Sequence, residues 1–271
     1  MSLHSQIRQQ LLGGLAQPQS DEVVQLNNAL RLVSKWRSAL IQNTLLQHQG
    51  TVVMAGPLKG LDFLAQSTEG CHIPKLLGCY EQPLLPYIET AIQAGYPVIL
   101  NIGCAEGYYA VGMARRMPNT RVLAFDLNPK AQQACADLAA KNGVSERVTV
   151  GGLFKPEDFS VYASQRVLVL CDIEGAERDL LNPSVAPGLA GMDVIVEAHE
   201  CLLPGITKLL IDRFSATHDI IVVEDSGQRQ LADTSGWFNN IAHLDQLLAV
   251  WEWRSGPTPW LVMMAKAEAK L

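Results

Sequence analysis

The stretch PVILNIGCAEGYYA (97–110) runs from continuous apolar residues, through two glycines, into a helical pattern. Gly103 permits a sharp turn, and Gly107 lets a helix start close to the preceding strand. Ala105 keeps the loop between them thin, so that backbone can approach a ligand without side chains in the way. The stretch is typical either of a tight strand-to-helix turn or of a loop that holds a nucleotide-like ligand.

From this loop onward the chain alternates apolar strands with helices. The first five expected strands lie at 97–103, 122–127, 147–150, 166–173 and 193–200. Helical patterns fill 108–117 and 130–142, and Asn128 is placed to cap the second helix. Strands that are apolar on both faces and alternate with helices indicate a parallel, doubly wound α/β sheet. The last two expected strands, 218–225 and 259–267, break the rhythm and leave an antiparallel edge open.

A helical segment precedes this domain. Val23, Leu26 and Leu30 recur at helical spacing within residues 21–47, which predicts an amphipathic helix with Ser20 as its cap. Its apolar stripe either packs on the main domain or forms a dimer contact.

A Gly-rich stretch follows the helix. Residues 51–80 hold short apolar runs, which predicts an irregular or β-like cover for the next domain. We therefore divide the chain into an N-terminal accessory segment, residues 1–74, and a main domain, residues 75–271.

The amino-acid composition limits the classes of binding partner that we expect. The chain has 271 residues, 48% of them hydrophobic, which is enough for a full core. A net charge of -6 gives no footprint for nucleic acid or an anionic membrane. No leader pattern and no apolar run of about 18 residues occurs, so no membrane span is expected. Six cysteines without a C-x-x-C pair suit a reducing compartment, and we expect a cytoplasmic protein.

An aspartate at the end of the second expected strand bears on the ligand. Asp126 follows Gly107 by 19 positions, where an acidic residue meets the two hydroxyls of a ribose. Asn128 already takes the better capping position, so an adenosine-containing ligand is favoured. Glu106 in the loop would repel a diphosphate and attract a cation, which favours S-adenosylmethionine over NAD. The alternative for Glu106 is a solvated carboxylate favoured by the helix dipole.

The chain resembles the class I S-adenosylmethionine-dependent methyltransferases, and within them the FkbM-like branch, over residues 75–267. The resemblance is carried by LLGCYEQPLLPYIE (76–89), NIGCAEGYYAVGMA (101–114), AFDLNP (124–129), CDIEGAERDLL (171–181) and VIVEAHE (194–200). It implies a Rossmann-like, seven-stranded, mostly parallel sheet with one antiparallel strand near the C-terminus. It also implies S-adenosylmethionine as cofactor and methylation of a hydroxyl on a small natural product or sugar.

The same resemblance implies a set of cofactor-binding residues. Gly103, Ala105 and Gly107 would flank the methionine part of the cofactor. Asp126 would bind the ribose, and Leu127 would border the adenine. The full set assigned to the cofactor is Glu81, Asn101, Gly103, Cys104, Ala105, Glu106, Gly107, Asp126, Leu127 and Asp172.

Two members of this set have alternatives. Asn101 stands where the family usually has an acidic residue that contacts the cofactor's ammonium group. Glu81 either places a charge near the cofactor or is a carboxylate at a helix N-terminus.

Polar residues at the ends of the fourth and fifth strands mark the reacting end. Asp172 ends the fourth strand, and alternation sends Glu197 and His199 to one side of the fifth strand. We assign His199 as the general base and Asp172 as a second catalytic residue. For His199 the alternative is packing on the next helix. Asp172, Glu197 and His199 could also gather a divalent metal. Because their spacing is not diagnostic, no metal is assigned.

The resulting expectation is an S-adenosylmethionine-dependent O-methyltransferase that acts on a small-molecule acceptor. N-methylation and a non-catalytic S-adenosylmethionine-binding module stay open as alternatives. Neither nucleic acid nor a membrane is expected as a partner, and a homodimer through the N-terminal helix is an open alternative.

Overall fold

The computed structural model describes residues 2–17, 21–67, 71–231 and 236–269. It divides into two compact units. The smaller unit combines Met1–Gly50 with Asp233–Trp251, and the larger combines Thr51–Ala232 with Glu252–Leu271. The described residues of 51–74 thus group with the larger unit, while the assignment of 75–271 as the functional domain stays a prediction.

The larger unit is built on one seven-stranded sheet. Its strands are β1 Val98–Ile102, β2 Arg121–Phe125, β3 Val148–Gly151, β4 Val167–Cys171, β5 Asp193–Glu197, β6 His218–Val223 and β7 Trp260–Ala265. They lie in the order β3-β2-β1-β4-β5-β7-β6. The first five strands pair in parallel, whereas β7 is antiparallel to both β5 and β6. The predicted Rossmann-like sheet with an antiparallel C-terminal strand is confirmed.

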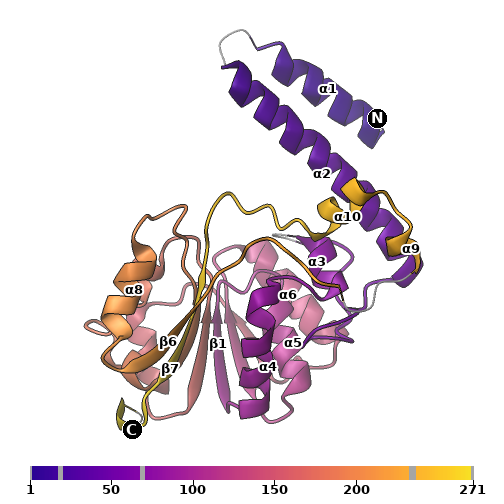
Figure 1. Cartoon of the computed structure of the whole chain (residues 1–271). Coiled ribbons are helices and arrows are strands. Elements are labelled where there is room, and N and C mark those ends of the chain that lie inside the picture. The colour runs from indigo at the N-terminus through magenta and orange to yellow at the C-terminus, as the bar shows by residue number, and fades with distance from the viewer. Residues whose placement is uncertain (1, 18–20, 68–70, 232–235, 270–271) are drawn as a thin grey trace. The chain divides into compact units, whose positions relative to one another are not determined.

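Helices cover both faces of this sheet. The helices of four residues or more are α3 His72–Leu77, α4 Leu85–Ala94, α5 Tyr108–Arg116, α6 Pro129–Lys141, α7 Glu177–Leu180 and α8 Ile206–Phe214. In Figure 1, α8 lies on one side of the sheet and α4, α5 and α6 lie on the other. The 3-10 turns are η1 Gln82–Leu84, η2 Pro156–Tyr162, η3 Pro187–Gly191 and η4 Ala267–Ala269. Residues of β1 and β4 are buried throughout, which explains why these strands read as continuous apolar runs.

Local sequence signals set the ends of two helices beside the sheet. Helix α6 begins at Pro129, and the side chain of Asn128 accepts a hydrogen bond from the backbone N–H of Lys130, as the predicted cap requires. Helix α5 begins directly after Gly107, whose φ of 88° suits glycine. Both helices therefore start at the carboxyl ends of β1 and β2.

The smaller unit is helical. Its helices are α1 Leu3–Leu15, α2 Glu22–Gln49, α9 Gly236–Asn239 and α10 His243–Val250. Arg37 on α2 binds Asp245 on α10 through two hydrogen bonds of 2.7 and 2.6 Å. The predicted cap Ser20 lies outside the described residues, and the side chain of Asp21 caps α2. Among the described helices, none combines the length and apolar character that a bilayer crossing demands.

Candidate active site

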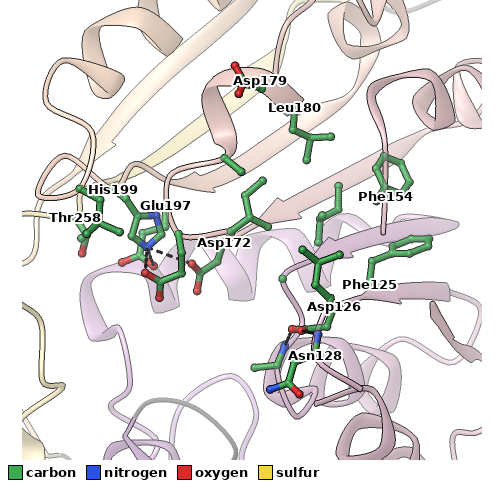
Figure 2. Close-up of a pocket in the computed structure, with 18 of the residues that line it drawn as sticks. Phe125, Asp126, Asn128, Phe154, Asp172, Asp179, Leu180, Glu197, His199 and Thr258 are labelled. Atoms are coloured by element: carbon green, nitrogen blue, oxygen red, sulfur yellow. Dashed lines mark hydrogen bonds and ion pairs between the residues drawn. The ribbon is translucent and has the colours of Figure 1, made fainter. Parts of the chain in front are cut away.

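A cavity of about 760 Å³ opens at the carboxyl ends of β1, β2, β4 and β5. This is where doubly wound sheets bind ligands, at the point where the strand order reverses. Figure 2 shows Asp126 toward one end of the cavity, Glu197 and His199 toward the other, and Asp172 between them. The cavity therefore has two chemically distinct ends.

The glycine loop after β1 forms part of the wall. A Cβ added to Gly103 would lie 1.6 Å from the carbonyl oxygen of Asp172, so no other residue fits against β4 at this point. Ala105 adopts a left-handed conformation with a φ of 45°. Its backbone N–H donates to the Asp126 carboxylate at 2.9 Å. The loop after β1 is thus held in shape by the residue that ends β2.

The Asp126 carboxylate can accept hydrogen bonds in addition to the one from Ala105. Its two oxygens accept from the backbone N–H groups of Ala105 and Asn128, at 2.9 and 2.8 Å. Because a carboxylate offers about four lone-pair sites, it can accept further hydrogen bonds from a ligand. Leu127 is 72% exposed, and Phe125 and Phe154 line the same end of the cavity with their rings 4.8 Å apart. This end combines a hydrogen-bond acceptor with apolar surfaces that suit a nucleobase.

Glu106 does not play the electrostatic role expected of it. Its carboxylate is fully buried, pairs with the Lys75 ammonium at 2.5 Å and accepts a hydrogen bond from Ser67 at 2.7 Å. A charge paired in this way is largely neutralised, and Glu106 does not line the cavity. The inference that a free carboxylate in the loop selects against a diphosphate is therefore wrong.

Four other residues assigned to the cofactor, Glu81, Asn101, Cys104 and Gly107, are absent from the cavity wall. Asn101 is buried in β1, where its side chain donates to the carbonyl of Leu170. Gly107 is required by packing, since an added Cβ would lie 2.6 Å from the sulfur of Cys135. The cavity does bring together Gly103, Ala105, Asp126, Leu127, Asp172 and His199.

A buried glutamate that the sequence analysis did not assign holds the reacting end together. Glu177 accepts the Nδ1–H of His199 at 2.8 Å and the backbone N–H groups of Ile173 and Gly175 at 3.3 and 3.2 Å. It lies inside the CDIEGAE stretch, five positions after Asp172. The motif therefore wraps the turn after β4 around one carboxylate, which also fixes the histidine.

Carboxylates surround the other ring nitrogen of this histidine. His199 Nε2 lies 3.4 Å from Asp172, 3.7 Å from Glu197 and 3.8 Å from Glu174. Burial alone lowers the pKa of His199, but the hydrogen bond to Glu177 and the charge of Glu197 outweigh it and the pKa is raised. Burial also raises the pKa of Asp172, and the charge of Glu197 adds to the effect. The surrounding carboxylates thus favour the charged imidazolium, whereas the neutral ring is the form that accepts a proton in general-base catalysis.

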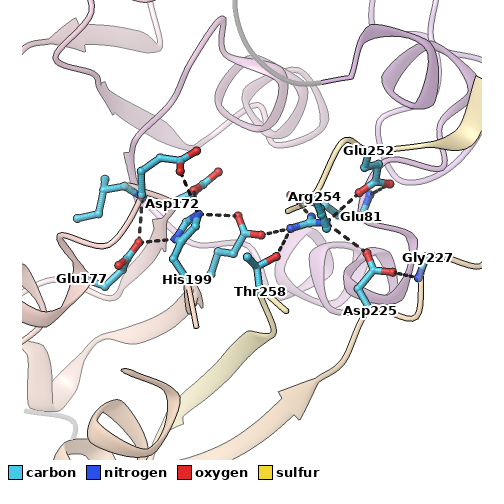
Figure 3. Close-up of polar contacts among 12 residues, drawn as sticks. Glu81, Asp172, Glu177, His199, Asp225, Gly227, Glu252, Arg254 and Thr258 are labelled. Atoms are coloured by element: carbon cyan, nitrogen blue, oxygen red, sulfur yellow. Dashed lines mark hydrogen bonds and ion pairs between the residues drawn. The ribbon is translucent and has the colours of Figure 1, made fainter. Parts of the chain in front are cut away.

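An arginine network borders this cluster, and the sequence analysis did not identify it. Arg254 contacts the carboxylates of Glu81, Glu197, Glu252 and Asp225 and the hydroxyl of Thr258 (Figure 3). Arg229 adds ion pairs to Asp225 and Glu252. The stretch WEWRSGPT (251–258) carried the only signal, an arginine and a glutamate among tryptophans near the C-terminus.

Backbone strain gathers at the same place. Among the described residues, the non-glycine residues with positive φ are Glu81, Ala105, Glu174 and Trp253. Three of them line the cavity, and Glu81 binds the cavity residue Arg254 at 3.0 Å. Such conformations cost about 1–3 kcal/mol each and cluster at functional sites. Their location supports a function for this cavity.

The fully buried Glu81 gives a testable pH dependence. Burial raises its pKa to about 8, and the charge of Glu197 acts in the same direction. Since the folded pKa lies above the unfolded one, folding takes up a proton. The stability contributed by this group is present below the unfolded pKa and is lost as pH rises through the folded pKa.

Glu81→Gln should therefore raise the melting temperature by a few degrees at about pH 8, and by less at about pH 5.5, because glutamine stays neutral. Thermal denaturation at both pH values measures the difference. Glu89→Gln is the control, because the ion pair with Arg116 lowers the pKa of Glu89 and no gain at high pH is expected. Equal shifts of Glu81→Gln at both pH values would contradict the prediction.

Sequence comparison finds bacterial methyltransferases. The chain is 28% identical over 120 residues to a ribosomal protein L11 methyltransferase of Hamiltonella defensa, covering 40% of this chain and 39% of that protein. It is 35% identical over 82 residues to the same enzyme of Pectobacterium carotovorum, covering 30% of this chain and 26% of that protein. The chain thus matches well under half the length of these relatives. No protein-family model matches the chain.

Solved structures with a similar fold are also methyltransferases. A putative O-methyltransferase of Klebsiella pneumoniae aligns with a TM-score of 0.48 and 14% identity, over 87% of this chain and all of that one. The O-methyltransferase TomG of Streptomyces achromogenes, solved with S-adenosylmethionine, aligns with a TM-score of 0.44 and 13% identity, over 98% of this chain and 100% of that one. The Rossmann-like fold of this chain follows from its own strand order, β3-β2-β1-β4-β5-β7-β6.

Proposed function

We propose that this chain is an S-adenosylmethionine-dependent methyltransferase that methylates a hydroxyl group of a small molecule. The observation that supports this most is the single cavity with two ends. One end offers Asp126 between apolar surfaces, and the other offers Asp172, Glu197 and His199. A methyltransferase needs one site for an adenosine cofactor and an adjoining polar site for an acceptor.

The residues present fit the cofactor. Gly103 and Ala105 leave room for a ligand against backbone, and Asp126 keeps lone pairs for two ribose hydroxyls. Phe125, Leu127 and Phe154 would enclose the adenine. Bound S-adenosylmethionine supplies a methyl group on a positively charged sulfur. The carboxylate of Asp172, which lies beside His199 on the side that faces Asp126 (Figure 2), suits a neighbouring positive charge.

The side chains at the acceptor end of the cavity, which holds Asp172, Glu197 and His199, would orient the methyl acceptor. Glu177 fixes the ring of His199, which presents Nε2 to the cavity beside Asp172 and Glu197. Orientation of the acceptor oxygen along the line of displacement supplies much of the rate in such reactions. His199 and Asp172 stay our catalytic assignments, as residues that would contact the acceptor.

Cofactor binding tests the proposal directly. Calorimetry with S-adenosylhomocysteine should give binding at one site per chain, and NAD should bind more weakly. Any preference for S-adenosylhomocysteine over NAD must come from the groups that line the cavity, because Glu106 is paired with Lys75. Tighter binding of NAD would overturn the assignment.

Asp126→Ala should weaken S-adenosylhomocysteine binding about 10- to 100-fold, because one or two hydrogen bonds to a charged acceptor are lost. The variant also removes the brace on Ala105, so calorimetry should be repeated with an analogue that lacks the ribose 2′-hydroxyl. If Asp126 binds the ribose, the loss caused by the substitution should be smaller for this analogue. An equal loss for both ligands would assign Asp126 to the loop alone.

N-methylation is the second candidate, and the charge of the acceptor end favours it. Asp172, Glu174 and Glu197 gather there, and a protonated amine would suit them. The ribosomal protein L11 methyltransferases among the relatives share only the matched part of the chain. Turnover assays with parallel sets of alcohols and amines separate the candidates, and cofactor binding without turnover on either set would favour a non-catalytic module.

The remaining parts of the proposal concern the family branch, the compartment and the assembly. We assign the chain to the FkbM-like branch on the CDIEGAE stretch, and to the cytoplasm because all six cysteines are free thiols. Leu26 and Leu30 on α2 are 63% and 65% exposed, which supports a homodimer through this helix.

A further inference from the structure

Three side chains at the acceptor end present ligand atoms to a common point. One oxygen each of Asp172 and Glu197 and a ring nitrogen of His199 lie within 4.8 Å of one another. Nε2 of His199 is 3.4 Å from Asp172 Oδ1 and 3.7 Å from Glu197 Oε2. Neighbouring ligands around an octahedral cation with bonds of about 2.1 Å are separated by about 3 Å. Small side-chain rotations would bring the three atoms to such a geometry.

The orientation of the histidine is a second, independent observation. His199 is only 4% exposed, and its Nδ1–H is taken by Glu177 at 2.8 Å. Because a carboxylate only accepts, the neutral ring must carry its proton on Nδ1 and direct the lone pair of Nε2 toward Asp172 and Glu197, which lie 3.4 and 3.7 Å away. Within the described part of the chain Nε2 makes no hydrogen bond. A carboxylate behind a histidine in this way is the usual support of a metal-binding imidazole.

The environment of Glu197 leaves one oxygen available. Arg254 binds Glu197 Oε1, while Oε2 is the atom that faces His199. Arg254 therefore holds the carboxylate in place from behind without covering the atom that faces the cluster.

The charge balance favours a cation at this point. The connected region contains seven carboxylates, those of Glu81, Asp172, Glu174, Glu177, Glu197, Asp225 and Glu252. Only two guanidinium groups, those of Arg229 and Arg254, and the imidazole of His199 face them among the described residues. Carboxylates crowded into a buried site repel one another when they are charged, and a divalent ion would offset this repulsion.

We propose that Asp172, Glu197 and His199 bind one divalent cation of the Mg²⁺/Mn²⁺ class, with Glu177 and Arg254 positioning the ligands. Two carboxylate oxygens and one imidazole nitrogen suit Mn²⁺ and leave coordination positions open to the cavity. In this arrangement His199 is a ligand, and an acceptor hydroxyl bound at an open position would lose its proton to water more readily. Only this last role rests on the proposed methyl transfer; the cation site itself does not.

The test is a titration of the metal-free chain with Mn²⁺ alone, followed by the loss of the free Mn²⁺ signal in electron paramagnetic resonance. The wild type should take up one Mn²⁺ per chain. Asp172→Asn keeps the shape of its side chain, and His199→Gln replaces the ring with a neutral polar group; each should weaken uptake at least about tenfold. Asp179→Asn is the matched control: this aspartate lines the same cavity but forms an ion pair with Arg178 on the surface, and uptake should be unchanged.

Circular dichroism identifies variants that fail to fold, and a rise in the melting temperature of the wild type with added Mn²⁺ gives a readout that needs no variant. No uptake by the wild type at millimolar Mn²⁺, or uptake that Asp172→Asn and His199→Gln leave intact, would overturn the cation site. S-adenosylhomocysteine calorimetry on the same metal-free samples keeps the two proposals apart. Cofactor binding without Mn²⁺ uptake would overturn the cation site and leave the proposed methyl transfer standing.

Discussion

His199→Ala is expected to lower the turnover number about a hundredfold or more while S-adenosylhomocysteine affinity changes little. The imidazole lies at the acceptor end of the cavity and is oriented by Glu177, whereas Asp126 lies toward the opposite end. Its removal therefore takes away acceptor orientation and any bound cation without touching the expected ribose site. Steady-state kinetics and calorimetry on the same preparation measure the two effects.

His218→Ala is the matched control for this prediction. His218 is also a buried histidine, with Nε2 bound to the carbonyl of Met192 at 2.7 Å, but it lies on the edge strand β6 and does not line the cavity. Its loss should lower the melting temperature and leave turnover per folded molecule unchanged. If His199→Ala behaves in the same way, His199 is a packing residue and has no part in the chemistry.

Glu177→Gln separates positioning from contact. Glutamine can still accept the Nδ1–H of His199, but it removes the charge that polarises the ring. Turnover should fall about 10- to 100-fold, less than for His199→Ala, and Mn²⁺ uptake should weaken with it. A purely structural Glu177 would change the melting temperature and leave Mn²⁺ affinity as it was.

The sheet was predictable because its signals are local. Each parallel strand is a short apolar run bounded by turn residues, and burial on both faces removes the need for alternation. The antiparallel insertion of β7 between β5 and β6 was only an open alternative, because pairing partners depend on how the chain returns. The resemblance to a known family, rather than the pattern, favoured one topology.

In the candidate site, too, the residues with local sequence signals were predictable, and those whose partners lie far away in the sequence were not. Gly103 and Asp126 were assigned to a ligand site because the turn and the strand end that hold them are visible in the sequence, and both line the cavity. Glu106 was misjudged because its partner, Lys75, lies 31 positions earlier and meets it only in the folded chain. Arg254 reaches Glu197 across 57 positions and Glu81 across 173, which no spacing rule could indicate.

Gly103→Ala should be the most damaging single methyl group in the described part of the chain. The added Cβ would lie 1.6 Å from the carbonyl oxygen of Asp172, far inside van der Waals contact, and the φ of 78° adds strain. The loop after β1 must then move away from β4, which displaces both the cavity wall formed by this loop and Asp172. We expect a loss of about 4 kcal/mol or more, equivalent to a fall of about 10 °C or more in melting temperature.

Substitutions at two other glycines serve as controls that separate the steric clash of Gly103→Ala from backbone strain and from a change in the cavity wall. Gly143→Ala meets nothing within 4 Å but has a φ of 66°, so it measures conformational strain alone, at about 1 kcal/mol. Gly152→Ala lines the cavity with only Gln132 nearby, at 3.8 Å, and should be tolerated. Thermal denaturation ranks the three variants, and calorimetry shows whether folded Gly103→Ala still binds S-adenosylhomocysteine. If Gly103→Ala costs no more than Gly143→Ala, the loop is free to retreat from β4, and the close approach of Gly103 to Asp172 is not what shapes the cavity.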